Sequence, residues 1–280
     1  MIVRKLSAPD GAEGAAPTRT AEKIVTRMPV LIIALGRGRV GKTAMLNALI
    51  QHYLRLGCDL RIWNADQQNE THSLSRFHPD VAEPPPRAGL VDTKLWLEGN
   101  IQDQSRQQYD AALDFAGGDP LIKKLAVEVR LVRALERMGI RPVAMHVVGP
   151  EKADLDYLRQ VSEEGLFMPE ATLIVLNGGL VESSRSVDHA FTEVGNHPVV
   201  LNAMKKGAEV VMMPPLACMS RIADLGISFA DAACNRFRPA QEPLSFFDQE
   251  RTAIWLDDEL PKFFGGIPAH WMPRLSAKGG

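Results

Sequence analysis

The chain has 280 residues, of which 45% are hydrophobic, so it can bury a sizeable core in one or two domains. Its formal net charge of -2 gives no global basic field, so overall charge provides no argument for nucleic-acid binding. Cys58, Cys218 and Cys234 lie far apart without a CxxC pair, and no apolar run approaches the roughly 18 residues that cross a bilayer. These features predict a cytoplasmic protein with reduced thiols.

The first 28 residues differ from the rest of the chain. They are rich in Ala, Gly, Pro, Thr and charges, and they lack the uninterrupted apolar stretch of a signal peptide. We expect a flexible leader over 1–28. Its scattered basic residues leave a nucleic-acid-binding arm as the alternative interpretation.

Strand and helix patterns alternate along residues 29–240. Apolar runs predict strands at 30–35, 60–64, 111–115, 143–148, 171–176 and 209–213. Helical patterns cover 43–56, part of 91–109, about 120–138, 154–163 and 187–194. Residues 71–90 contain His78-Pro79 and three consecutive prolines, which predicts a connection between elements.

This alternation predicts one α/β domain over 29–240, with a mostly parallel, doubly wound sheet in three layers. Sheets of this kind bind ligands at the carboxyl ends of their strands. Four residues fall at such ends, namely Asp66, Asp114, Asn177 and Pro214. Residues 241–280 are rich in prolines and aromatics and form a predicted C-terminal tail, either packed along the domain or used as an interaction segment.

A glycine-rich loop between the first strand and the first helix carries the clearest chemical signal. It reads Gly36-Arg37-Gly38-Arg39-Val40-Gly41-Lys42-Thr43 and matches GxxxxGK[ST] in the required strand–loop–helix context. Its backbone N–H groups and the positive end of the helix dipole would surround phosphates. The nucleotide-binding residues we expect here are Gly36, Gly38, Arg39, Val40, Gly41, Lys42, Thr43 and Ala44.

The loop resembles the deviant Walker A motif of the ParA/MinD-type ATPases, whose form is KGGxGK[ST]. Asn64-Ala65-Asp66-Gln67-Gln68-Asn69 resembles the DxDPQ segment of that family, and Leu113 to Gly118 resembles its switch segment. Asn177 resembles the asparagine that reads adenine, and the stretch 210–215 resembles the strand and prolines beside the base. The similarity covers residues 29–235.

Three positions depart from the family pattern. Arg37 stands where the family has its signature lysine, which reaches the nucleotide of a partner subunit in an ATP-bound dimer. An arginine can make that contact bidentately. Arg39 replaces a glycine, so we expect position 39 to take a backbone conformation that an ordinary side chain can adopt. Asn64 replaces the first aspartate of DxDPQ, while Asp66 keeps the second.

The resemblance implies ATP and Mg²⁺ as ligands and specific roles for the matched residues. Lys42 would bind the phosphates, and Thr43, Asp66 and Asp114 would hold Mg²⁺ directly or through water. Asn177 and Pro214 would contact the base, and Arg37 would act on the partner's phosphate.

Each of these roles has a structural alternative. Asp66 and Asn177 would otherwise form turns, Asp114 would cap a strand end, and Arg37 would be a solvated charge. For Asp119 we favour a helix cap, because Pro120 follows it at the first helical position.

The stretch GGDP, Gly149-Pro150 and Leu176-Asn177-Gly178-Gly179 look most similar to a plasmid branch of the family, the StbB-like and TraL-like ATPases of plasmid stability and conjugal mobilisation. This resemblance implies a weak ATPase that dimerises with ATP and acts with plasmid or conjugation proteins, with DNA as a further candidate partner. The alternative is a metabolic P-loop kinase or ligase, with 71–90 as a lid. A GTPase is disfavoured because the NKxD motif is absent.

Overall fold

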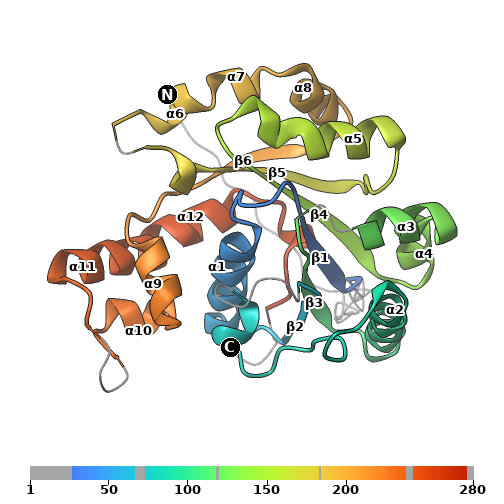
Figure 1. Cartoon of the computed structure of the whole chain (residues 1–280), viewed down its shortest axis with the longest axis horizontal. Helices are drawn as coiled ribbons and strands as arrows, with labels where there is room; N and C mark the ends of the chain where they lie inside the picture. The colour runs from blue at the N-terminus through green and yellow to red at the C-terminus, as the bar shows by residue number, and fades with distance from the viewer. Residues whose placement is uncertain (1–26, 67–72, 118–119, 183, 238–241, 276–280) are drawn as a thin grey trace, which may run out of the picture.

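The computed structural model describes residues 27–66, 73–117, 120–182, 184–237 and 242–275. Six parallel strands form one open sheet in the order β2-β3-β1-β4-β5-β6 (Figure 1). The strands are β1 Val30–Leu35, β2 Leu60–Asn64, β3 Asp110–Asp114, β4 Arg141–Val148, β5 Ala171–Asn177 and β6 Glu209–Met213. The described strands agree with the predicted ones to within two residues, and the predicted doubly wound fold is confirmed.

β1 lies inside the sheet because both of its faces are apolar. All six of its residues are buried, and it pairs with β3 on one side and β4 on the other. Val30, Ile32 and Ala34 pack toward one layer of helices, while Leu31, Ile33 and Leu35 pack toward the other. This double burial is typical of a strand in a parallel sheet.

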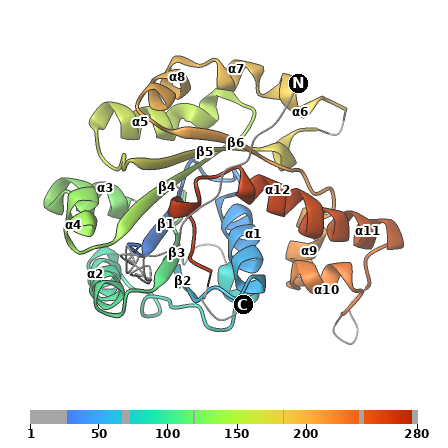
Figure 2. The ribbon, with the colours of Figure 1, turned by 180° about the vertical axis from the view of Figure 1, so that it is seen from behind.

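One layer of helices covers the face of Ile32. It consists of α1 Lys42–Arg55, α9 Met219–Leu225, α10 Phe229–Ala233, α11 Phe246–Ile254 and α12 Leu260–Gly265. Figure 1 shows this layer in blue, orange and red to the left of the sheet, and Figure 2 shows α12 running beside α1. Nearly the whole first turn of α1 is apolar or buried, which anchors the loop that precedes it.

The opposite layer covers the face of Ile33. It contains α2 Leu90–Gln107, α3 Pro120–Val129, α4 Leu131–Arg137 and α5 Asp156–Glu164. The short helices α6 Val187–Ala190 and α7 Thr192–Gly195 continue this layer together with α8 Pro198–Lys205, over the β5–β6 end of the sheet. None of the described helices is long and apolar enough to span a membrane.

Two predicted helices are shorter than the sequence pattern indicated. The helix expected over 120–138 is broken at Arg130, whose φ of 51° lies in the left-handed region and separates α3 from α4. The helix expected over 187–194 is two helices, α6 and α7, which meet at Phe191 with φ -95° and ψ 3°. Backbone angles at a single residue decided both breaks, and the hydrophobic periodicity does not encode them.

Residues of the predicted C-terminal tail are helical and share a core with α1. α11 passes into a π-helical turn, Trp255–Glu259, and then into α12, where Pro261 lies in the first turn. Trp255, Leu260 and Phe264 are buried in the same cluster as Ile50 and Tyr53 of α1. The described part of 241–280 therefore packs along the domain.

Several sequence predictions fall outside the described residues. Most of the predicted leader, residues 1–26, is among them, as are Gln67, Gln68 and Asn69 of the DxDPQ-like segment. Gly118 and Asp119 of the GGDP stretch are also outside the description.

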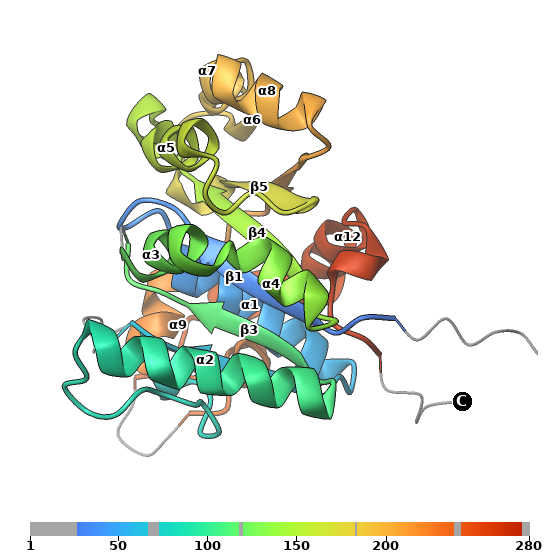
Figure 3. The ribbon, with the colours of Figure 1, turned by 90° about the vertical axis from the view of Figure 1, so that its right-hand side faces the viewer.

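The two ends of the described chain meet at the edge where the strands begin. The Arg27 guanidinium donates to the carbonyl oxygens of Ala269 and Met272. The backbone N–H of Arg274 donates to the Asp110 carboxylate at 2.7 Å. Figure 3 shows the two ends of the described chain on the same side of the molecule. The loop after β1 lies at the opposite edge of the sheet.

Candidate functional site

The glycine-rich loop joins the carboxyl end of β1 to α1, and two of its glycines have no substitute. Gly36 has φ 141°, and a Cβ there would lie 2.6 Å from the carbonyl oxygen of Val147 on β4. Gly41 has φ 90°, and a Cβ would lie 2.4 Å from Nδ2 of Asn177. Both positions combine a left-handed backbone with close approach to a neighbour, which only glycine accommodates.

Arg39 corrects one expectation. We expected an ordinary backbone conformation at this position, but its φ is 68°, in the left-handed region. A non-glycine residue pays about 1–2 kcal/mol for that conformation. Gly36 and Gly41 on either side of it also have positive φ values, and Arg39 itself is exposed.

Lys42 begins α1 and turns back over the loop. It is 7% exposed, and its Nζ donates to the carbonyl oxygen of Arg37 at 3.2 Å. Burial lowers the pKa of Lys42, while the nearby carboxylates of Asp114 and Asp66 oppose that shift. The ammonium group is therefore held inside the loop, where an anion would relieve its desolvation.

Thr43 and Asp114 join the loop to the end of β3. Thr43 Oγ1 donates to Asp114 Oδ2 at 2.7 Å, and Asp114 is 1% exposed. Burial raises the pKa of Asp114 to about 6, against the lowering effects of the Thr43 hydrogen bond and of Lys42. The second carboxylate oxygen, Oδ1, is buried and accepts no hydrogen bond from any of the described residues. A buried carboxylate oxygen left in this state is suited to a cation or its water shell.

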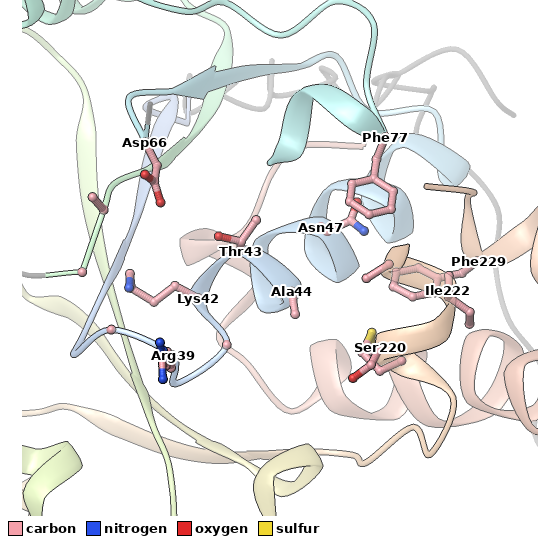
Figure 4. A pocket seen from close by; sticks show the side chains of 16 residues that line it. Arg39, Lys42, Thr43, Ala44, Asn47, Asp66, Phe77, Ser220, Ile222 and Phe229 are labelled. Carbon is pink, nitrogen blue, oxygen red and sulfur yellow. The ribbon is translucent and has the colours of Figure 1, made fainter. Parts of the chain in front are cut away.

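Asp66 follows β2 and faces the same space. Figure 4 shows its carboxylate directed toward Lys42 and Thr43. Asn64, two residues earlier, serves a different purpose: its Nδ2 donates to Ser73 Oγ and Glu83 Oε1, both at 2.9 Å. Asn64 therefore ties the chain after β2 to the following segment, and Asp66 alone of the pair lies in the cavity.

The few oxygen ligands at this site suit Mg²⁺ rather than a metal ion that is bound by protein side chains alone. Thr43, Asp66 and Asp114 supply one hydroxyl and two carboxylates. Within the described ranges there is no group of three His, Cys, Asp or Glu side chains arranged to hold a metal ion. Mg²⁺ commonly takes one or two protein oxygens and completes its shell with water and phosphate.

Arg37 points away from this arrangement. Its Nη1 lies 3.5 Å from Asp154 Oδ1, and its side chain is 56% exposed. It does not line the cavity around Lys42 and Thr43. In a single chain, Arg37 is thus positioned at the surface beside the loop.

Asn177 and Pro214 lie on the other side of the loop, at a second cavity of about 830 Å³. Asn177 Nδ2 donates to the carbonyl oxygen of Val40 at 2.9 Å, and its Oδ1 accepts from the Gly179 N–H at 3.0 Å. The Pro214 carbonyl accepts from Trp255 Nε1 at 3.0 Å. Asn177 therefore stabilises the backbone of the loop at Val40.

The first cavity has a volume of about 870 Å³ and extends well beyond the loop. Gly38, Arg39, Gly41, Lys42, Thr43 and Asp66 line one part, and Asn47, Phe77, Met219, Ile222, Ala223 and Phe229 line the other (Figure 4). No motif in the sequence marks Asn47, Phe77 or Phe229 as candidate site residues. Asn47 lies one helical turn after Thr43, and that spacing is the signal that would have placed it beside the site.

The segment after β3 rests directly on the loop. A Cβ on Gly117 would lie 2.6 Å from both the N and Cα atoms of Gly38. Ala116 and Gly117 also line the first cavity. A movement of this segment would therefore displace the backbone of the loop at Gly38.

Comparisons with known proteins found matches among solved structures and none in sequence. No protein-family profile matches the chain, and no curated protein matches it in sequence. Among solved structures, MinD from Aquifex aeolicus is 14% identical, with 80% of this chain and 95% of that chain covered and a TM-score of 0.43. The MinC:MinD complex from the same organism gives 14% identity, coverage of 86% and 98%, and a TM-score of 0.47.

The signal recognition particle receptor FtsY from Elizabethkingia anophelis, solved with GDP, is 15% identical, with coverage of 70% and 59% and a TM-score of 0.43. The description of the fold rests on the structure of the chain itself. The strand order and the loop at the end of β1 establish a three-layer α/β/α fold of the P-loop nucleotide-binding type.

Proposed function

We propose that this chain binds ATP with Mg²⁺ at the loop 36–43 and hydrolyses it slowly, as a switch ATPase of the ParA/MinD type. The observation that carries the proposal is the convergence of Lys42, Thr43 and Asp114 on one side of a glycine loop at the carboxyl end of a central strand. Each of these side chains is buried or half-buried and has a geometry that an anionic ligand with a cation would complete.

The loop and Lys42 would bind the β- and γ-phosphates. Positive charge would come from the ammonium group, the backbone N–H groups and the amino end of α1. Thr43, Asp66 and Asp114 would hold Mg²⁺, which when bound neutralises phosphate charge. Thr43 Oγ1 already lies on Asp114, so the hydroxyl and the carboxylate are oriented before ligand arrives.

Asp114 also provides a route from the phosphate end to the rest of the protein. It is followed after one residue by Ala116 and Gly117, and Gly117 packs against Gly38 of the loop. Presence or loss of the γ-phosphate would then be sensed at both Asp114 and this segment, as in order–disorder switches built on γ-phosphate contacts.

The finer proposal is an ATP-dependent homodimer acting in the cytoplasm in plasmid stability, partition or conjugal mobilisation, with plasmid or conjugation proteins and DNA as partners. The sequence resemblance supports it. The exposed position of Arg37 supports a contact in trans, since the side chain is 56% exposed and lies outside its own cavity.

Substitution of Lys42 tests the phosphate site. Lys42→Ala is expected to weaken ATP binding by at least about a hundredfold, because a charge-assisted contact to phosphate is removed from a desolvated position. Isothermal titration calorimetry with Mg²⁺ and ATP measures the effect. The control is Lys124→Ala on the surface of α3, which should bind ATP as wild type does. Equal affinity in Lys42→Ala and wild type contradicts the proposal.

A further inference from the structure

Helix α11 exposes three large apolar side chains to solvent. Phe246 is 67% exposed, Phe247 is 70% exposed and Ile254 is 53% exposed. No other phenylalanine of the described residues is exposed to this extent. The rings of Phe246 and Phe247 have centroids 6.0 Å apart and contact each other edge to face. A single exposed apolar side chain is ordinary, but a cluster of them on one helix indicates an interaction surface.

The helical repeat places Phe247 and Ile254 on the same face of α11. They are seven residues apart, which is close to two full turns. The buried face of this segment carries Thr252, Trp255 and Leu256 instead. Figures 1 and 2 both show α11 at the periphery of the molecule, beyond α9 and α10. Because the backbone of a helix is hydrogen-bonded internally, a partner can recognise this face only through side chains.

The segment that carries these apolar side chains is acidic. Residues 246–259 contain five carboxylates and one arginine, a net charge of -4, whereas the whole chain has a net charge of -2. The arginine, Arg251, pairs with Asp248 at 2.7 Å. Asp257 pairs with Arg55 of α1 at 2.8 Å. These two ion pairs leave an excess of negative charge on the segment.

Two of the carboxylates flank the apolar face without any ion pair. Glu250 lies three residues after Phe247, and Asp258 lies four residues after Ile254, so each is a neighbour of an apolar side chain on the helix surface. Neither carboxylate forms an ion pair or a hydrogen bond with the described residues. The exposed face of α11 therefore combines an apolar line with free negative charges beside it.

This combination favours one kind of occupant. A second copy of the chain, packed α11 against α11, would bring two acidic segments together, and like charges at contact repel. A membrane surface that contains anionic lipids would repel the same carboxylates. A helix with an apolar stripe and basic side chains complements both features at once.

We propose that Phe246, Phe247, Glu250, Ile254 and Asp258, the α11 surface, bind an amphipathic helix of another protein that carries lysine or arginine beside its apolar stripe. Apolar side chains of that helix pack against Phe247 and Ile254, and its cations pair with Glu250 and Asp258. The proposal goes beyond nucleotide binding and does not depend on it.

The docked helix would lie beside one of the two large cavities. Ile254 lines the cavity of Asn177 and Pro214, whereas Phe247 lines neither that cavity nor the one around Lys42. Substitution of Phe247 therefore tests the α11 surface without altering the walls of either cavity.

A designed peptide tests the apolar part of the surface. The probe is a fluorescein-labelled peptide of about 14 residues, with leucine at the a and d positions of two heptads and lysine elsewhere. Fluorescence anisotropy with the full chain is expected to give a Kd below about 100 μM, and Phe247→Ser should raise it at least about tenfold. The control is Val127→Ser, 71% exposed on α3, which should stay within about twofold of wild type. A peptide with the same residues in shuffled order should not bind.

A charge reversal tests the acidic part. Glu250→Lys/Asp258→Lys should bind the lysine peptide at least about tenfold more weakly than wild type, and should bind the matching glutamate peptide more tightly. Asp80→Lys/Glu163→Lys changes the net charge by the same amount at other exposed sites and should keep the wild-type preference. Thermal unfolding by circular dichroism verifies that the variants are folded, as expected for substitutions at exposed positions.

Several results would overturn the proposal. Equal affinity of wild type and Phe247→Ser for the lysine peptide would remove the α11 surface as its site. Nucleotide-free dimers in light scattering that Phe247→Ser abolishes would assign the surface to a second copy. Sedimentation with phosphatidylglycerol vesicles that Phe247→Ser abolishes would assign it to a membrane.

The nucleotide site is tested separately. Phe247→Ser should bind ATP as wild type does, and Lys42→Ala should bind the lysine peptide as wild type does. Failure of the proposed nucleotide site would thus leave the peptide results unchanged, and failure of peptide binding would leave ATP binding unchanged.

Discussion

Asp114 is a carboxylate whose ionisation the fold opposes. Thr43 donates to one oxygen and Lys42 lies nearby, but the desolvation of the carboxylate outweighs their effects. In the proposed site this carboxylate would bind a cation, and its burial lowers the stability of the free protein. Buried acids with a raised pKa are frequent in binding and catalytic sites.

Removal of this charge should stabilise the free protein at neutral pH. The pKa of Asp114 in the folded state is raised to about 6, so the folded protein binds more protons than the unfolded chain between about pH 4 and pH 6. Stability of the wild type therefore falls as pH rises through that window. Asp114→Asn should be more stable than wild type by about 1–3 kcal/mol at pH 8 and no more stable at pH 3.5.

Urea denaturation at the two pH values measures the difference. Asp80→Asn, at an exposed turn, is the control and should show the same small difference from wild type at both. An Asp114→Asn advantage that does not change with pH would contradict the raised pKa.

Gly117 and Gly38 make a second comparison at the residue scale. A Cβ at Gly117 would lie 2.6 Å from backbone atoms of Gly38, whereas a Cβ at Gly38 meets nothing within 4 Å. Gly117→Ala is expected to lower the free energy of unfolding by about 1–3 kcal/mol, because two backbones must separate. Gly38→Ala should stay within about 0.5 kcal/mol of wild type. Equal effects in urea denaturation would argue against the contact.

The sequence predicts which candidate residues lie near one another better than it predicts their side-chain contacts. Lys42, Thr43 and Asp66 line one cavity, and Asp114 lies behind it on Thr43, because carboxyl ends of parallel strands share one edge, which the element pattern predicts. Arg37 could not be placed, since its contact with Asp154 depends on a side-chain conformation and on a residue far along the chain. The position of Asn47 could not be predicted from the sequence, because it depends on contacts with Gln51 and His78 and, through Gln51, with the backbone of Phe229.

The six strands of the sheet could be predicted from the sequence, but the helices α11 and α12 near the C-terminus could not. Six strands follow from continuous apolar runs, whose length and flanking glycines leave little choice. α11 and α12 are interrupted by a π-helical turn, and Pro261 falls in the first turn of α12, which breaks the 3.6-residue period. The packing of α12 against α1, and of α11 against α10, is a property of tertiary structure and could not be derived from local pattern.

Trp255 shows how strongly α11 and α12 belong to the core. It is 1% exposed, packs on Phe229 at a ring distance of 4.9 Å and donates Nε1 to Pro214. Trp255→Ala should reduce the free energy of unfolding by about 3–5 kcal/mol, as expected for a large buried aromatic. Ile254→Ala, next to it but 53% exposed, should change stability by at most about 0.5 kcal/mol. A small effect of Trp255→Ala in urea denaturation would show that the C-terminal helices are only loosely attached.

At the scale of the whole molecule, the exposed side chain of Arg37 leads us to expect that two copies of the chain associate when ATP is bound. In the presence of Mg²⁺ and a non-hydrolysable ATP analogue, the molar mass by light scattering is expected to double relative to the ADP-bound protein. Arg37→Ala should remain monomeric, because a bidentate contact to phosphate in trans is lost. Arg133→Ala, an exposed arginine on α4, should dimerise as wild type does. A monomer under every condition would exclude the dimeric switch.

The meeting of the chain ends at the start of the strands has a consequence for connectivity. Arg27 contacts the backbone at Ala269 and Met272, and Arg274 is held by Asp110. A short linker in place of residues 1–26 and 276–280 could therefore join residue 275 to residue 27, with new ends opened at the exposed turn of Gly207. In such a circular permutant, β6 and the C-terminal helices would leave the ribosome before β1 and its loop, while every strand kept its neighbours.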